Sequence, residues 1–565
     1  MSATADGREP AAPGAGHVIG PRGRLLWCAV LLLTTLAPYF YCRLRVNSAH
    51  FLWILPPYAQ DSLAYLAWER QAMNGAWLFS MKYTALPHAP FLFQPFFLLV
   101  GLFARMTGVA PPVANLLVKA VGTILFVHVW FRFVRAFRLG RAEAWFATAM
   151  MAFASGVGGW IALFSPNAAK FSADLWLVDL NTYWSLLWNS LFPLSMALIL
   201  ETMVQGEEAL RNRPTAPAVR AGLCLAGLAL VHPYQIPILG IYCLVRWGMQ
   251  LRRAAWRPAW VFGVVCLAPV AYLVAMELGQ PLLARHATQG QMPTPAAPQV
   301  LLGLGVPLLL AVAGALRRTT RRNGLVLFIA LSVLGAYVPC WFQRKMLFGL
   351  HPVVCAAAGL ALGLLPVASR WRGRAMAGGA NTREGMETLR GFPYQRFAMT
   401  RRLGWAAAGV LVALLSVSNL TLVKSQAEKV LQPGLANPFA VDADVWKTLE
   451  YLRANTRSSD LVFASPALSG LIPAVSGNTV IWGHWAQSVD VDQRVSTLQR
   501  VFSPGSGLSD AQRSGEFWSM GMKYLLVDPS FRQQLLAADS RWLTRDLQQI
   551  WESGATAVYK KSGAP

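Results

Sequence analysis

Asp61 is the residue of this chain whose type and position most favour chemistry. It lies in the segment Pro56–Tyr65, shortly after the first hydrophobic stretch. Ionisable groups beside a bilayer are costly to desolvate, so such a carboxylate often has a function. As a general base it could take the proton of an incoming hydroxyl group. The alternative is structural, because aspartate is a favoured N-cap and an amphipathic stretch, Ser62–Asn74, follows with Glu69 and Arg70 expected to face water.

Two more acidic residues, Asp174 and Asp179, lie in a polar loop between Phe164 and Tyr183. Because they are five residues apart, they could bind a divalent cation such as Mg²⁺ or Mn²⁺, or hold a polar acceptor. The alternative is an ordinary surface loop that contains Asp and Asn for their turn propensity.

His232 and Tyr234 flank a proline, Pro233, between two short apolar stretches. Proline breaks a helix, and irregular backbone at membrane depth is tolerated only beside protein or a water-filled cavity. A histidine at such a break is either a structural hydrogen-bonding residue or part of a functional site.

Arg344 and Lys345 are adjacent basic residues in a connection where few basic residues are expected. They could bind an anionic phosphate, since arginine offers a two-pronged donor. The alternative is snorkelling of both side chains toward lipid headgroups.

Trp482 and His484 belong to a Trp-Gly-His-Trp segment at the end of an expected strand. Aromatic faces stack on sugars, so this segment could contact a sugar. An ordinary turn at a strand end is the alternative.

The composition predicts an integral membrane protein to position these residues. Of 565 residues, 55% are hydrophobic and 13% are charged, and the mean hydropathy is +0.40. Such values exclude a typical soluble enzyme. We expect about 11 transmembrane helices, at 25–41, 113–131, 143–164, 184–203, 219–232, 235–249, 258–276, 299–316, 323–341, 346–367 and 403–420.

The distribution of basic residues predicts the orientation of the chain. The N-terminal tail and alternate connections carry 26 Lys and Arg residues, against 9 in the opposite connections. The positive-inside rule then places the N-terminus in the cytosol and Asp61 outside. The net charge of +24 is therefore a topology signal, and nucleic acid is not an expected partner.

Three parts are expected along the chain. Residues 1–24 form a disordered cytosolic tail, 25–420 a transmembrane domain with a first exterior loop at 42–112, and 421–565 an exterior α/β domain. The apolar segment Phe91–Ala104 is too short to span, so we expect an interfacial helix.

The α/β domain is predicted from its local patterns. We expect helices at Asp444–Asn455, Asp492–Phe502 and Asp510–Met520, and strands at Leu461–Ala464, Thr479–Trp482, Lys523–Val527 and Ala555–Tyr559.

In this order, the motifs resemble those of the GT-C superfamily of polytopic membrane glycosyltransferases, which includes protein O-mannosyltransferases and aminoarabinose transferases. The resemblance is closest to uncharacterised bacterial members. It rests on Asp61–Ala67, Gly75–Phe79, Val231–Tyr234, Gln343–Leu347 and Trp482–Trp485.

The resemblance implies an enzyme of the bacterial inner membrane with a periplasmic C-terminal domain. It would transfer a sugar from a polyprenyl-phosphate donor, with inversion, to a lipid, polysaccharide or protein acceptor. Asp61 would be the catalytic base and Asp179 the nearest match to a second acid. Some relatives use a divalent cation, so the resemblance leaves Mg²⁺ or Mn²⁺ open as a cofactor.

The remaining candidates take roles around the same expected cavity. The donor phosphate would meet Arg344 and Lys345, with His232 and Tyr234 beside them. The sugar or acceptor contacts would come from Asp174, Trp482 and His484.

Two other functions fit the same architecture. One is a transporter or flippase of a lipid-linked saccharide, and the other is a catalytically inactive membrane protein. A transporter should show polar residues through several spans and paired repeats. Charges inside the expected spans are few, Lys119 being the clearest, which favours the enzyme.

Overall fold

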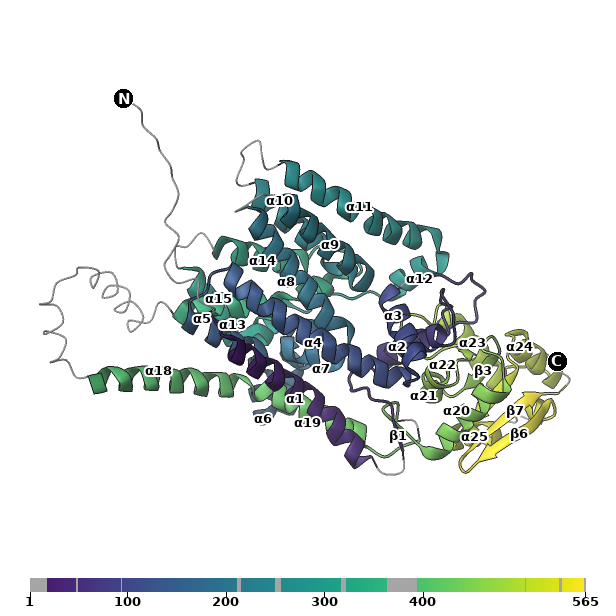
Figure 1. Cartoon of the computed structure of the whole chain (residues 1–565). Helices are drawn as coiled ribbons and strands as arrows, with labels where there is room; N and C mark the ends of the chain where they lie inside the picture. The colour runs from purple at the N-terminus through teal and green to yellow at the C-terminus, as the bar shows by residue number, and fades with distance from the viewer. Residues whose placement is uncertain are drawn as a thin grey trace, which may run out of the picture.

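The computed structural model describes residues 18–46, 49–92, 94–210, 215–248, 256–316, 322–362, 394–435, 437–503, 505–537 and 541–562. Residues 1–17 of the predicted disordered tail therefore lie outside the described residues. A helical bundle makes up one end of the molecule, and a small sheet with its helices makes up the other (Figure 1).

Five helical segments of the described residues are long and apolar enough to cross a membrane: Pro21–Arg45 (α1), Pro111–Ala136 (α4), Ala259–Gly279 in α11 (Trp256–Gly279), Ala297–Ala315 (α13) and Gly404–Leu431. The last segment joins α18 (Tyr394–Leu415) to α19 (Val417–Leu431). A sixth candidate is a pair bent by 48°, α5 (Arg141–Phe153) with α6 (Gly158–Phe164). The chain is a membrane protein.

The predicted number of about 11 spans is not confirmed. Several expected spans are shorter or broken helices in the structure. The stretch expected at 184–203, for example, is divided between α7 (Thr182–Trp188) and α8 (Leu191–Ala209). Other shorter helices at expected spans are α9 (Thr215–Val231), α10 (Ile236–Gly248), α14 (Arg322–Gly335) and α15 (Leu350–Ala361).

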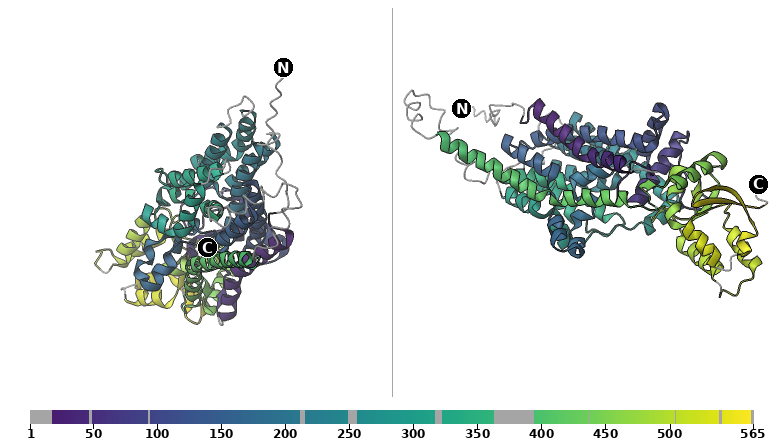
Figure 2. Two further views of the ribbon diagram at one scale, coloured as in Figure 1. Left: turned by 90° about the vertical axis from the view of Figure 1, so that its left-hand side faces the viewer. Right: turned by 90° about the horizontal axis from the view of Figure 1, so that it is seen from below.

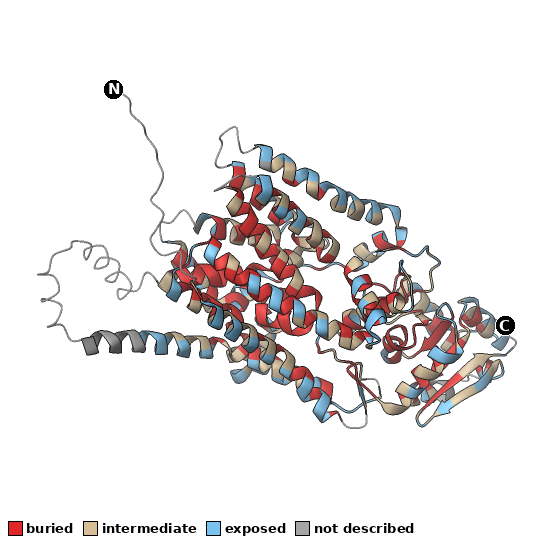
Figure 3. Ribbon diagram, viewed as in Figure 1, coloured by how far each residue is buried: buried red, intermediate tan, exposed pale blue. Residues whose placement is uncertain are grey.

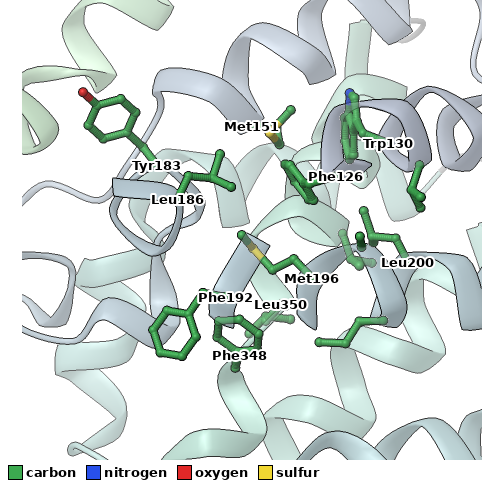
Figure 4. Close-up of a cluster of buried hydrophobic side chains, with 14 of the residues drawn as sticks. Phe126, Trp130, Met151, Tyr183, Leu186, Phe192, Met196, Leu200, Phe348 and Leu350 are labelled. Carbon is green, nitrogen blue, oxygen red and sulfur yellow. The ribbon is translucent and has the colours of Figure 1, made fainter. Parts of the chain in front are cut away.

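Large apolar side chains fill the centre of the bundle. Phe126 and Trp130 of α4 lie beside Met151 of α5 and face Phe192 and Met196 of α8 (Figure 4). Buried residues run along the inner faces of these helices, and exposed residues lie on the outer helices such as α11 (Figure 3). Helices that are apolar on nearly all sides are typical of such a membrane-embedded bundle.

The first loop, between α1 and α4, contains β1 (His50–Phe51), α2 (Ala59–Met73) and α3 (Pro95–Thr107). Helix α3 is the short apolar helix expected near Phe91–Ala104, with proline at its start and Gly108 in the left-handed region at its end (φ 71°). Helix α2 begins at Ala59, so Tyr58 is its N-cap and Asp61 lies within its first turn. The predicted N-cap role of Asp61 is wrong.

The sequence also misplaced the polar side of α2. Glu69 is fully buried and accepts a hydrogen bond from Asn115 of α4. Helix α3 approaches closely here, because a Cβ atom on Gly101 would collide with the carbonyl oxygen of Glu69. Arg70 donates to the carbonyl oxygen of Ala474 at 2.6 Å. Helix α2 is therefore packed on several sides rather than facing water.

A five-stranded sheet organises the C-terminal α/β region, residues 437–562. Its order is β4-β3-β5-β7-β6, with β3 (Leu461–Ala464), β4 (Thr479–Val480) and β5 (Tyr524–Val527) parallel, and β6 (Leu547–Ser553) and β7 (Thr556–Lys561) antiparallel. The expected helices are present as α20 (Ala443–Asn455), α23 (Val491–Phe502) and α24 (Asp510–Ser519). The predicted small α/β region is confirmed.

The first loop and the C-terminal region share one hydrophobic core. Strand β1 pairs antiparallel with β2 (Ala440–Val441). Leu63 and Leu66 of α2 pack with apolar residues of the C-terminal region, including Leu471 of α22 (Leu471–Val475). Helices α2 and α3 lie between the bundle and the sheet (Figures 1 and 2). The domain boundary at residue 421 stays a prediction, and α19 runs through that position.

Candidate functional site

Asp61 is held by two side chains of the C-terminal region. Its Oδ1 atom accepts the indole N–H of Trp485 at 2.7 Å and lies 3.3 Å from Nε2 of His484. The backbone N–H of Trp485 also donates to Oε1 of the neighbouring Gln60, at 2.9 Å. The carboxylate side chain keeps 21% of its surface exposed. Asp61 is therefore partly exposed at the contact between α2 and the C-terminal region.

This arrangement engages only one oxygen of the Asp61 carboxylate, Oδ1. Both contacts from the C-terminal region go to Oδ1, and no protein partner of Oδ2 is found among the described residues. A carboxylate fixed through one oxygen can present the other to a substrate hydroxyl.

The hydrogen bonds of His484 identify its tautomer. Its Nδ1 atom accepts the backbone N–H groups of Ala486 and Gln487 at 3.1 and 3.0 Å. An atom that accepts cannot carry a proton, so the hydrogen of the neutral ring is on Nε2. That N–H faces Asp61. The side chain of His484 is only 5% exposed.

The backbone turn after β4 explains why His484 and Trp485 reach Asp61. Gly483 has φ 131°, and a Cβ atom there would lie 3.0 Å from backbone atoms of Ser469 and Gly470. Only glycine tolerates this conformation at such a close approach. Trp482, on the other side of the turn, donates its indole N–H to the carbonyl oxygen of Ala464 at 3.1 Å. The turn thus directs Trp482 into the C-terminal core and the next two residues toward α2.

Asp61 is an ionised carboxylate in this setting. Burial raises its pKa, but the hydrogen bonds from His484 and Trp485 and the positive charge of Lys345 outweigh burial, so the pKa lies below the usual value of aspartate. Its charge contributes to raising the pKa of Tyr65, after burial, which is the larger cause.

Asp179 and Lys345 form an ion pair. Nζ of Lys345 lies 3.1 Å from Oδ1 and 3.3 Å from Oδ2 of Asp179, whose side chain is 1% exposed. Both residues lie in short 3-10 helices, η3 (Val178–Leu180) and η6 (Gln343–Leu347). The structure therefore pairs Asp179, the predicted second acid, with Lys345, one of the two predicted phosphate-binding cations.

Arg344 is the other predicted phosphate-binding cation, and its guanidinium has no protein partner among the described residues. Its Nε atom is buried without a hydrogen bond. The backbone N–H of Arg344 donates to the carbonyl oxygen of Met292 at 3.2 Å, which anchors the segment. Arg344 lies close enough to Tyr58, the N-cap of α2, to lower the pKa of that phenol, although burial raises it more. It is a cation positioned near α2 and available to an anion.

His232 and Tyr234 lie in an aromatic cluster beside Lys345. The ring centroid of His232 is 4.7 Å from that of Phe348 and 4.9 Å from that of Tyr234. His232 is 3% exposed, and its Nδ1 atom has no hydrogen-bond partner in the described ranges of the chain. Tyr234 lies near enough to Tyr65 of α2 to influence its pKa. The break between α9 and α10 is thus adjacent to the site.

Asp174 lies in a separate polar cluster and is fully buried. Its carboxylate accepts hydrogen bonds from Ser155 at 3.0 Å and Ser172 at 2.5 Å. Burial raises the pKa of this carboxyl group. Asp174 is thus bonded to serines and Asp179 to a lysine, and the possible divalent cation at these two acids stays unconfirmed. No group of three His, Cys, Asp or Glu side chains that could hold a metal ion is found in the described part of the chain.

Helix α12 (Pro281–Gln289) is a third element beside the site that the sequence did not indicate. Arg285 forms an ion pair of 2.5 Å with Asp490, the N-cap of α23. Burial and the neighbouring His484 lower the pKa of His286 to about 4, while Asp61 acts in the opposite direction. Sequence reasoning also missed the contact of Trp485, although this residue was part of the Trp-Gly-His-Trp segment.

Comparisons with known proteins support the fold. A scan against protein-family models and a search of curated proteins found no match. Among solved structures, the chain is similar to ArnT from Cupriavidus metallidurans in the apo state, with a TM-score of 0.51 and 11% identity over 95% of this chain and 98% of that one. The form of ArnT bound to undecaprenyl phosphate gives a TM-score of 0.51 and 12% identity over the same shares.

A second similar structure is the arabinofuranosyltransferase AftD from Mycobacteria. The TM-score is 0.53 with 15% identity, over 96% of this chain and 40% of AftD. The agreement covers both the helical bundle and the C-terminal region. The chain therefore has a GT-C-like fold, as the sequence resemblance implied.

Proposed function

We propose that the chain is a membrane glycosyltransferase that moves a sugar from a polyprenyl-phosphate donor to an acceptor hydroxyl, with inversion and with Asp61 as general base. The observation that carries this proposal is the geometry of Asp61. Its Oδ1 atom is anchored by Trp485 and His484, and no protein partner of its Oδ2 atom is found in the described residues.

The acceptor hydroxyl would bind at Oδ2. As the hydroxyl oxygen attacks the anomeric carbon, its proton passes to the carboxylate, and the bond from that carbon to the phosphate oxygen breaks with the electron pair leaving on the phosphate. A single displacement of this kind inverts the anomeric centre. His484 and Trp485 hold the base in place and keep it ionised.

The leaving phosphate needs positive charge near it. Arg344 supplies that charge in this proposal, because its guanidinium has no protein carboxylate of its own in the described residues. Lys345 is already paired with Asp179, so the role of Asp179 becomes to position Lys345 rather than to act on substrate. The similarity to a structure that binds undecaprenyl phosphate supports this class of donor.

The reaction would take place on the exterior face of the bacterial inner membrane. The bias of basic residues toward the opposite connections supports this orientation. The C-terminal region would then lie in the periplasm and close the site from that side.

The test is a transfer assay on the purified full chain in vesicles. It would be given polyprenyl-phosphate sugars with candidate acceptors, and release of polyprenyl phosphate and the configuration of the product would be measured. We expect release of the lipid phosphate with an inverted product. Movement of an intact lipid-linked sugar between leaflets, without cleavage of the sugar–phosphate bond, would contradict the proposal and favour a flippase.

A further inference from the structure

Lys119 is a buried cation that the proposed reaction does not use. It lies in α4, in the half that begins at the first loop, and is 2% exposed. Its Nζ atom donates to the carbonyl oxygen of Leu187 at 3.0 Å and lies 3.5 Å from the ring centroid of Tyr39 in α1. An ammonium has three N–H groups, so these two contacts leave it able to donate further.

Lys119 lines a small cavity with two other buried donors. The cavity lies between α1, α2, α4 and the junction of α7 with α8, and Trp188 and Asn189 line it as well. Nε1 of Trp188 and Nδ2 of Asn189 are buried and have no hydrogen-bond partner among the residues that the structure describes. These residues are 6% and 5% exposed. Buried donors of this kind are rare in folded proteins and call for a ligand.

The arrangement selects for a negatively charged oxygen. Oδ1 of Asn189 already accepts the backbone N–H of Leu191 at 3.0 Å, which leaves the amide N–H₂ as its free group. Within the described part of the chain, no acidic side chain lines the cavity. A water molecule accepts only two hydrogen bonds, whereas an oxyanion accepts several and is attracted by the ammonium.

Size and position narrow the ligand. The cavity has a volume of about 20 Å³, which admits one or two oxygen atoms and excludes a sugar ring. Trp53 of the first loop and Ser62 of α2 also line the cavity, so it opens where the bundle meets that loop. In the proposed orientation this boundary lies at the level of the lipid headgroups on the exterior face.

The geometry points to a phosphate-binding pocket at Lys119, Trp188 and Asn189. This pocket takes the terminal oxygens of a phosphate group and is separate from Arg344. That group belongs to a membrane lipid, a polyprenyl phosphate or a phospholipid, or is free phosphate. The pocket does not depend on Asp61 acting as a base.

The experiment measures binding of three probes to the purified full chain: a short-chain polyprenyl monophosphate, phosphatidylglycerol and inorganic phosphate. Trp188→Phe removes an N–H that bonds to nothing in the described protein, so it should not impair folding. We expect Trp188→Phe to weaken binding about tenfold for whichever of the three probes occupies the pocket. Asn189→Asp keeps the oxygen that accepts the backbone N–H of Leu191 and replaces the donors with negative charge, so it should abolish binding. Lys119→Met should also abolish binding, and Lys119→Arg should restore part of it.

Trp551→Phe is the matched control, because its indole N–H has a protein partner, Thr448, in the C-terminal region. The probe that loses affinity identifies the source of the phosphate. If Trp188→Phe and Asn189→Asp, with wild-type thermal stability, bind all three probes like the wild type, the cavity is a hydration site and the inference is overturned.

Arg344→Leu separates this inference from the proposed function. Loss of polyprenyl phosphate binding in Arg344→Leu, with binding of all three probes unchanged in the pocket variants, would refute the pocket and leave the proposed donor site intact. Loss in the pocket variants alone would support the pocket and refute the role of Arg344.

Discussion

The indole N–H of Trp485 donates to Oδ1 of Asp61 at 2.7 Å, across 424 residues of chain. This bond joins the first loop to the C-terminal region at the residue that we propose as the base. Since α2 and the C-terminal region also share a hydrophobic core, the orientation of Asp61 depends on packing between two distant parts of the chain. The C-terminal region is therefore part of the proposed site rather than an appendage.

His484→Asn tests how Asp61 is kept ionised. The amide oxygen of asparagine can replace Nδ1 of His484 as acceptor of the two backbone N–H groups, but the contact to Asp61 is lost. Burial then dominates, so the pKa of Asp61 should rise. We expect the acidic limb of the kcat/KM profile to move to higher pH, measured against the wild type over pH 3–8. An unchanged acidic limb in a folded variant would contradict this account of His484.

The buried pair of Asp179 and Lys345 predicts a strong coupling. Removing one partner leaves an unpaired buried charge, which costs about 3–5 kcal/mol. Lys345→Met and Asp179→Asn should each lower the unfolding temperature, and the double variant should be more stable than the sum of the two effects implies. Additive effects in this double-mutant cycle would show that the pair is not coupled. The exposed pair of Arg500 and Glu516 is the control and should couple by at most about 1 kcal/mol.

Arg344→Leu should raise the KM for the lipid-linked donor. A hydrogen bond to a charged group is worth about 1.5–3 kcal/mol, so we expect a tenfold or larger increase. Arg344→Lys keeps the charge but not the two-pronged donor, so its KM should lie between those of the wild type and Arg344→Leu. Arg453→Leu, at a solvent-accessible residue of α20, controls for loss of a positive charge. A donor KM in Arg344→Leu equal to that of the control would exclude contact with the phosphate.

Glu69 predicts a pH-dependent stability. Burial raises its pKa well above the usual value, and the hydrogen bond from Asn115 opposes this only in part. A group with a raised pKa in the folded state stabilises the protein fully below its unfolded pKa of about 4.3, and this stability is lost as pH rises through the folded pKa. Glu69→Gln should keep the bond to Asn115 and flatten this dependence in thermal unfolding. An unchanged pH dependence would mean that Glu69 is not the titrating group.

Much of the fold could be predicted from local sequence patterns. Hydrophobic length indicated the membrane bundle, and the cap and strand signals of the C-terminal region located β3, α20, α23 and α24. Strand β6 was missed because its burial is low along its whole length, so it lacks the apolar alternation of a half-buried strand. The predicted number of spans is not confirmed, since apolar stretches such as 184–203 are interrupted by breaks that hydropathy does not register.

The candidate site was predictable as a set of residues but not as a set of contacts. Asp61, Lys345 and His484 stood out by charge or type in polar segments. The pairing of Lys345 with Asp179 and the contact of His484 with Asp61 join residues far apart in the chain. Only tertiary packing determines such pairs. Burial of Glu69 was equally invisible, because it follows from the close approach of α3 at Gly101.

The central claim is that Asp61 is the base of the transfer reaction. Its most direct test is the turnover rate of Asp61→Asn, compared with Asp492→Asn, which changes an exposed aspartate of α23. We expect Asp61→Asn to bind the donor but to lose about 10²–10⁴-fold in rate, while Asp492→Asn stays at the wild-type rate. A correctly inserted and folded Asp61→Asn that kept full transferase activity would contradict the claim.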